Sequence, residues 1–125
     1  MRTEVLMALA VKLVMTFIVG VVAFSFIDGN PWGQVFWVAL VATAVNYFVG
    51  DRMVLPSYGN ATAAVGDGIM GSIVAYLGAV ITEAFTVSAA SIVTFLVLVA
   101  IGEYFFHRYL VTADAGYRPR GETTG

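Results

Sequence analysis

Residues 60–83 read NATAAVGDGIMGSIVAYLGAVITE, an apolar run without proline that carries one interior acid, Asp67. At about 1.5 Å per residue, a helix of this length can cross a hydrocarbon core of roughly 30 Å. On a helical wheel, Asp67 shares a face with small residues such as Gly71 and Gly78. Small residues let neighbouring helices approach closely inside a membrane. We therefore expect a helix within a bundle, with Asp67 facing its neighbours and Gly68, Gly71 and Gly78 serving helix packing.

The composition of the whole chain favours a membrane protein. Of 125 residues, 60% are hydrophobic and 11% are charged, whereas soluble domains are about 45–50% apolar and about 25% charged. The net charge of −2, with no basic stripe, argues against nucleic acid as a partner. The chain has no cysteine and a single histidine, so we expect no disulfide, no all-protein zinc or other metal site, and no cofactor.

Four apolar segments are predicted to span the membrane within a domain of residues 1–110. Their expected bounds are 4–27, 31–50, 61–83 and 88–109. Residues 51–60 contain Pro56 and Gly59 and are predicted to be the longest internal loop, with Asn60 capping the next helix. The polar tail, residues 111–125, is predicted to be disordered. Because short turns make neighbouring helices antiparallel, we expect an all-α, up-down-up-down bundle of four transmembrane helices.

The basic residues predict how the bundle is oriented. In this arrangement they all fall on one side of the membrane: Arg2, Lys12, Arg52, Arg108, Arg118 and Arg120. Cytoplasmic segments of membrane proteins carry an excess of Lys and Arg. We therefore expect both termini and the 51–60 loop in the cytoplasm, with the lipid bilayer as the main partner.

Polar residues inside the predicted spans are the candidates for function, because a charge at the centre of a membrane helix costs about 2.5–3.5 kcal/mol. They lie toward the cytoplasmic side of their spans: Lys12, Asn46, Asp51, Asp67, Glu103 and His107. Lys12 and Asp67 sit at similar depths and can pair. Glu103 and His107 are four residues apart and therefore share a helix face.

Two interpretations of these residues remain open. In one, they line a polar pocket that opens to the cytoplasm and holds a proton, a cation or a small polar solute. In the other, they form a buried network of ion pairs and hydrogen bonds that fixes helix register. Lys12 can also extend its ammonium group to the lipid headgroups.

Two blocks of sequence carry a family resemblance: NYFVGDRMVLPSYGNATAAVGDG at residues 46–68 and IGEYFFHRYL at residues 101–110. They resemble the YndM-like family of small four-span membrane proteins of Gram-positive bacteria, over nearly all of the chain except the tail. The resemblance implies a four-span fold in the bacterial cytoplasmic membrane. It marks four residues as family positions: Asp51, Asp67, Glu103 and His107. The function of that family is unknown, so no activity or substrate is implied.

Three kinds of function follow from the sequence. The leading hypothesis is a non-enzymatic role, structural or partner-binding, as a homo-oligomer or with another membrane protein. The alternative is a small oligomeric transporter or channel module that uses Asp67 and Glu103 as proton- or cation-coupling carboxylates. Small multidrug transporters are similar in size, but they carry a glutamate in the first span where this chain has Lys12. An enzyme is disfavoured because no catalytic constellation is recognisable.

Overall fold

The computed structural model describes residues 3–113, of which residues 109–113 are described for their backbone alone. Every regular element in this part of the chain is a helix. In order they are α1 (Thr3–Gly20), the π-helical η1 (Val21–Ser25), α2 (Trp32–Val45), the π-helical η2 (Asn46–Val54), α3 (Leu55–Tyr58), α4 (Asn60–Ile81) and α5 (Ala89–Ala113).

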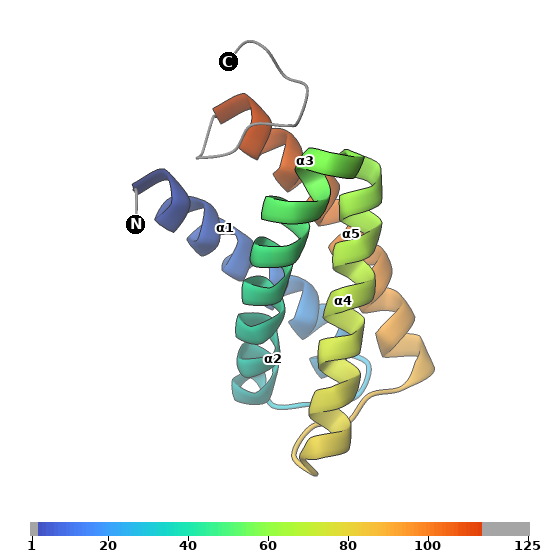
Figure 1. The fold of residues 1–125 in the computed structure, drawn as a ribbon. Coiled ribbons are helices and arrows are strands. Elements are labelled where there is room, and N and C mark those ends of the chain that lie inside the picture. Colours follow the sequence, from blue (N-terminus) through green and yellow to red (C-terminus); the bar gives the residue numbers. More distant parts are fainter. Residues whose placement is uncertain (1–2, 114–125) are drawn as a thin grey trace.

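Four continuous helical stretches of this region are long and apolar enough to cross a membrane. They run over Thr3–Ser25, Trp32–Tyr58, Asn60–Ile81 and Ala89–Arg108. The predicted all-α fold with four membrane-length helices is therefore confirmed. The start of α1, the short helix α3 and the end of α5 lie at one end of the bundle, and the 26–31 and 82–88 segments lie at the other (Figure 1).

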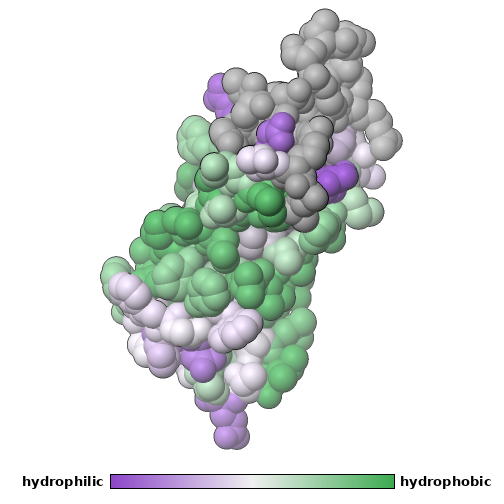
Figure 2. Space-filling model, turned by 90° about the vertical axis from the view of Figure 1, so that its left-hand side faces the viewer, coloured by the Kyte–Doolittle hydropathy of each residue, from purple (hydrophilic) through white to green (hydrophobic). Residues whose placement is uncertain are grey.

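The distribution of polarity is the reverse of that in a soluble protein. Large apolar side chains such as Trp37 and Phe105 are 61% and 62% exposed, whereas Lys12 and Glu103 are fully buried. A hydrophobic band covers the middle of the face shown in Figure 2, and paler and hydrophilic residues lie below it. Soluble proteins rarely expose so continuous an apolar surface. The surface is therefore the kind that lipid, rather than water, covers favourably.

The interior divides into two parts along the bundle. Toward the 26–31 and 82–88 segments, aromatic rings form a hydrophobic core in which Phe24 packs against Phe85 and Phe95, with ring centroids 5.1 and 4.8 Å away. Toward the other end, several polar and charged side chains are buried beside a smaller apolar cluster that includes Leu55 and Phe106. The apolar half supplies packing, and the polar half holds the candidate site.

Asn30 joins the two loops at the apolar end. Its side-chain amide donates hydrogen bonds to the carbonyl oxygens of Phe24, at 2.9 Å, and Thr86, at 2.6 Å. Its side-chain oxygen accepts a hydrogen bond of 2.8 Å from the backbone N–H of Thr86. One buried side chain thus bonds to the backbone of η1 and of the 82–88 segment, and it fixes the two helical hairpins to each other.

Two of the glycines predicted to serve packing lie where helices approach closely. A Cβ added at Gly68 would lie 2.6 Å from the backbone oxygen of Leu96, and one added at Gly71 would lie 3.0 Å from the Phe95 ring. The equivalent atom at Gly78 would make ordinary contacts, the nearest at 3.8 Å. Gly68 and Gly71 therefore mark the close α4–α5 contact, and Gly78 does not require a glycine on steric grounds.

The predicted 51–60 loop is wrong, because the second helix continues to Tyr58. Pro56 lies at the start of α3, where the π-helical geometry of η2 gives way to an α-helix. Gly59, with φ 92°, is the single residue between the end of α3 and the start of α4. Asn60 begins α4 but gives it no side-chain cap. At the far end, α5 extends to Ala113, and the rest of the predicted tail, residues 114–125, lies outside the described residues.

Candidate functional site

All six polar residues singled out from the sequence meet at one place, here called the polar cluster. Lys12 comes from α1, Asn46 and Asp51 from η2, Asp67 from α4, and Glu103 and His107 from α5. Each of these side chains is at most 1% exposed. The cluster therefore joins all four membrane-length helices through groups that lie out of contact with the outer surface.

Lys12 lies among three carboxylates. Its Nζ atom is 2.6 Å from both carboxylate oxygens of Glu103, 3.2 Å from Asp51 Oδ2 and 3.7 Å from Asp67 Oδ2. The ammonium group also lies 4.9 Å from the centre of the Phe106 ring. Lys12 therefore does not extend to the headgroups. It pairs with Asp67, as the sequence suggested, but its closest partner is Glu103.

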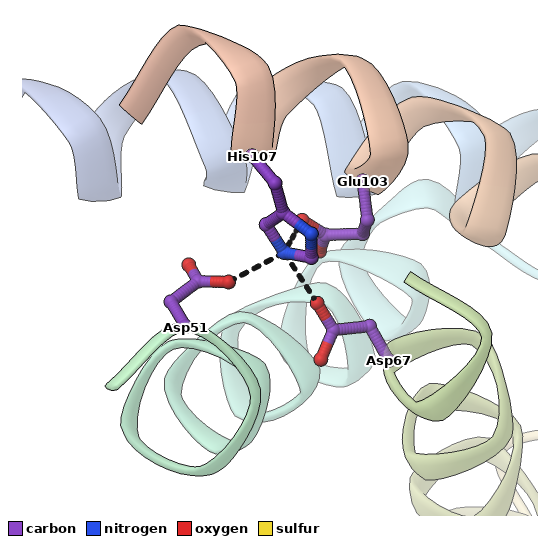
Figure 3. A group of neighbouring side chains, drawn as sticks. All are labelled: Asp51, Asp67, Glu103 and His107. Carbon is purple, nitrogen blue, oxygen red and sulfur yellow. Dashed lines mark hydrogen bonds and ion pairs between the residues drawn. The ribbon is translucent and has the colours of Figure 1, made fainter. Parts of the chain in front are cut away.

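His107 faces the same three carboxylates through its Nε2 atom (Figure 3). The distances are 2.7 Å to Asp51 Oδ1, 3.0 Å to Asp67 Oδ2 and 3.6 Å to Glu103 Oε1. The intrahelical partner Glu103 is thus the most distant of the three. The two closer partners belong to other helices, so His107 ties α5 to η2 and α4.

The contact with Asn60 shows that the other ring nitrogen of His107, Nδ1, carries a hydrogen. Asn60 Nδ2 donates a hydrogen bond of 3.0 Å to the carbonyl oxygen of Tyr104, which leaves Oδ1 facing His107 Nδ1 at 3.0 Å. Because Oδ1 is an acceptor only, Nδ1 must carry a hydrogen and donate it. In a neutral imidazole, Nε2 would then direct its lone pair at carboxylate oxygens. A proton, held on Nε2 or on a facing carboxyl group, or a metal ion bound at Nε2 makes this arrangement favourable.

The π-helical geometry of η2 places Asp51 in the cluster. In an α-helix, five residues turn the chain by about 500°, so that Asn46 and Asp51 would point about 140° apart. In a π-helix, the repeat of i to i+5 brings residues with that spacing onto one face. Asn46 and Asp51 are accordingly both buried. The side-chain nitrogen of Asn46 lies 3.5 Å from Glu103 Oε2. The side-chain oxygen of Asn46 has no hydrogen-bond partner.

Two residues of the site were not predicted from the sequence. Gly50 lies against the Asp67 carboxylate so closely that any Cβ at this position would overlap it. Asn60 was expected to cap a helix and instead orients His107. A signal for Asn60 did exist, because it precedes Asp67 by seven residues and therefore lies on the same helix face. For Gly50, the sequence offers no signal beyond its place beside Asp51.

The formal charges of the polar cluster do not cancel. Its three carboxylates contribute −3 and the Lys12 ammonium contributes +1, so the sum is −2 with a neutral His107 and −1 with a charged one. An uncompensated charge is strongly unfavourable away from water. The cluster therefore requires at least one further positive charge in a membrane, either a proton on one of its own groups or a bound cation.

The fold and the cluster define a class of small, all-helical proteins with four membrane-length helices and ionisable groups enclosed between them. Within it, the chain belongs to the family described as "Protein of unknown function (DUF2512)", whose model matches residues 3–122. No curated protein and no solved structure matches the chain. The match agrees with the expectation of a family without known function, and the YndM-like assignment stays a prediction.

Proposed function

We propose that the protein is a multi-pass protein of the bacterial cytoplasmic membrane, and that its polar cluster binds a cation as the coupling site of a small oligomeric transport or channel module. The role is not enzymatic. In this proposal both termini and α3 face the cytoplasm. Arg52 and Arg108 lie toward that end of the bundle, and the 26–31 and 82–88 segments carry no Lys or Arg.

One observation carries the proposal: the cluster is buried although its formal charges do not cancel. Ionisable groups inside membrane helices commonly mark ion pathways and proton relays. A purely structural network would gain from pairing each carboxylate with one positive group. Among the residues that the structure describes, Lys12 and His107 are the positive groups paired with the three carboxylates, so a further cation completes the set.

Oligomerisation follows from the size of the bundle. The described helices pack directly against one another, and the apolar half is filled by aromatic rings such as Phe24 and Phe95. A single copy therefore offers little space for a polar path across the whole membrane. A path at the interface between copies is the simplest arrangement that connects the cluster to both sides.

The proposal is tested by flux into liposomes that contain the purified protein. A trapped pH-sensitive dye reports protons, and trapped calcein reports Co²⁺ through quenching. We expect the flux of at least one of these cations to exceed that of empty liposomes. Asp67→Asn should reduce this flux at least about tenfold, which corresponds to a rise of about 1.4 kcal/mol in the activation free energy of the controlling step. Glu83→Gln, which removes an exposed carboxylate at the other end of the bundle, is the matched control and should keep the wild-type rate.

Two outcomes of the flux assay would refute a coupling role for the polar cluster. If wild-type liposomes carry no more flux than empty ones, or if Asp67→Asn and Glu83→Gln behave alike, the cluster is not a coupling site. Retention of the folded state by each variant is checked through its helical circular dichroism before reconstitution.

A structural or partner-binding role is the second candidate, favoured by the fact that the cluster links every membrane-length helix of the described chain. It predicts stable complexes in native membranes and no cation flux. Chemical crosslinking in membranes distinguishes the two candidates when it is combined with the flux assay. A monomer without partners would exclude this second role.

A further inference from the structure

We propose that the cation of the polar cluster is a divalent first-row transition-metal ion, such as Zn²⁺, Mn²⁺ or Co²⁺. Its ligands are the carboxylates of Asp51, Asp67 and Glu103 and the imidazole of His107. This inference names the cation that the proposed function leaves open, and it rests on that function. The sequence had argued against a metal site because it offers one histidine and no cysteine, but it did not show that three carboxylates meet around that histidine.

The positions of the ligand atoms fit such an ion. One atom from each of the four residues can be chosen so that all four lie within 4.8 Å of one another. For a tetrahedral zinc ion with bonds of about 2.0–2.1 Å, neighbouring ligand atoms are about 3.3 Å apart. The distances from His107 Nε2 to the three carboxylates, 2.7, 3.0 and 3.6 Å, lie on both sides of that value. The separations among the four ligand atoms extend up to 4.8 Å, so the carboxylates, which surround His107 Nε2 in Figure 3, must close inward around an ion.

The surroundings of the ligands supply independent support. A histidine that binds a metal commonly donates its other ring N–H to an oxygen, which fixes the ring and its tautomer. Asn60 Oδ1 accepts that hydrogen from His107 Nδ1, and the Asn60 amide is itself held by the backbone of Tyr104. In addition, the oxygen of the fully buried Asn46 has no hydrogen-bond partner, although its amide nitrogen lies 3.5 Å from Glu103. The cluster thus includes a buried polar atom whose hydrogen-bonding capacity the protein itself leaves unused.

The net charge of the polar cluster matches that of one divalent ion. With a neutral His107 and a charged Lys12, the cluster sums to −2, so one divalent ion brings it to zero. If His107 Nε2 carries a proton before binding, that proton is released to water and the metal ion binds the freed lone pair. The cluster then gains two positive charges from the ion and loses one with the proton, so its charge rises from −1 to zero. The mixture of imidazole and carboxylate ligands suits zinc, manganese, iron or cobalt better than calcium or magnesium, which prefer oxygen alone.

Lys12 has a defined part in this site. Its ammonium group lies 2.6 Å from both oxygens of Glu103, so it competes with a metal ion for the same carboxylate. The competition weakens metal binding and makes release easier, as transport requires. Replacement of Lys12 by methionine should therefore tighten metal binding at least about tenfold, whereas loss of a ligand should weaken it.

The test is metal binding by the full-length protein in lipid nanodiscs. Co²⁺ is the probe, because its visible absorption reports the ligands directly, and competition with Zn²⁺ gives the relative affinity. We expect about one ion per chain. Binding should be lost in His107→Gln and weakened about 10- to 100-fold in Asn60→Ala, which keeps every ligand but removes the group that orients His107. Glu83→Gln is the control and should bind like the wild type.

The possible outcomes separate this inference from the proposed function. If Co²⁺ and Zn²⁺ bind no better to the wild type than to His107→Gln, the metal site is refuted, and proton flux in liposomes would leave the proposed function standing. If the metal binds as expected but no cation crosses the membrane, the site stands and the transport role fails. Unchanged binding in Asn60→Ala and unchanged binding in Lys12→Met would each contradict the geometry argued above.

Discussion

Replacement of Lys12 by methionine should destabilise the protein more than any other single change in the polar cluster. Methionine matches the length of the lysine stem but removes the ammonium group that contacts Glu103 at 2.6 Å and Asp51 at 3.2 Å. Removal of one partner from a buried ion pair costs about 3–5 kcal/mol, because the other charge remains buried. Three carboxylates share this ammonium group, so we expect a loss toward the upper end of that range when no metal ion is present.

A second substitution separates this electrostatic effect from lost packing. In Lys12→Met combined with Glu103→Gln, the closest uncompensated carboxylate is also removed. The two changes should therefore be non-additive, with a coupling of about 2–3 kcal/mol. Arg52→Met removes an exposed basic residue from the same end of the bundle and serves as the control, for which no measurable change is expected.

The assay is unfolding in detergent micelles, followed through helical circular dichroism with chelator present. The measurement is then repeated with Zn²⁺, which should recover a larger part of the lost stability in Lys12→Met than it adds to the wild type. The reasoning is refuted if Lys12→Met unfolds within about 1 kcal/mol of the wild type, since a buried pair is worth more than that. It is equally refuted if the double variant shows simple additivity.

Further predictions concern packing in the rest of the bundle, and the same unfolding assay measures them. Gly68→Ala should lower the free energy of unfolding by about 1–3 kcal/mol, since its Cβ would lie 2.6 Å from a backbone oxygen of the neighbouring helix. Gly66→Ala, whose Cβ would meet no neighbouring atom within 4 Å, should raise it by about 0.5–1 kcal/mol. Equal effects of the two substitutions would contradict the close helix contact. Phe95→Ala should lose about 3–5 kcal/mol, whereas Phe105→Ala, 62% exposed on the apolar surface, should change little. Asn30→Ala should lose about 1–3 kcal/mol, because the backbone N–H and carbonyl groups of Thr86 lose their side-chain partner. A neutral result would show that Asn30 does not join the two hairpins.

The sequence was sufficient for the spans because the signal for a membrane helix is strong and local. A run of apolar residues long enough to cross the bilayer has few other uses, and each of the four predicted spans corresponds to a membrane-length helix. The same physics identified the members of the polar cluster. A charge within such a run is costly, so Asp67 and Glu103 could be expected to face other helices rather than lipid.

The details of the site depend on interactions that are not local. The end of the second span was placed too early because Asp51 and Pro56 are typical of a loop, whereas the π-helical η2 turns Asp51 inward and α3 accommodates Pro56 near its start. The close approach of Gly50 to Asp67 joins two helices and has no pattern within either one. The choice of Glu103 as the nearest partner of Lys12 likewise depends on how four helices pack.

Nitrogen NMR of the histidine ring, in protein reconstituted into lipid bilayers, tests the central claim most directly. The chain contains one histidine, so a sample labelled with ¹⁵N-histidine gives the signals of His107 alone. We predict a protonated Nδ1 whose signal moves in Asn60→Ala, and an Nε2 signal that moves in Asp51→Asn and Asp67→Asn and again when Zn²⁺ is added. A ring with the signals of a freely hydrated imidazole, unaffected by these substitutions and by Zn²⁺, would contradict the buried cation site.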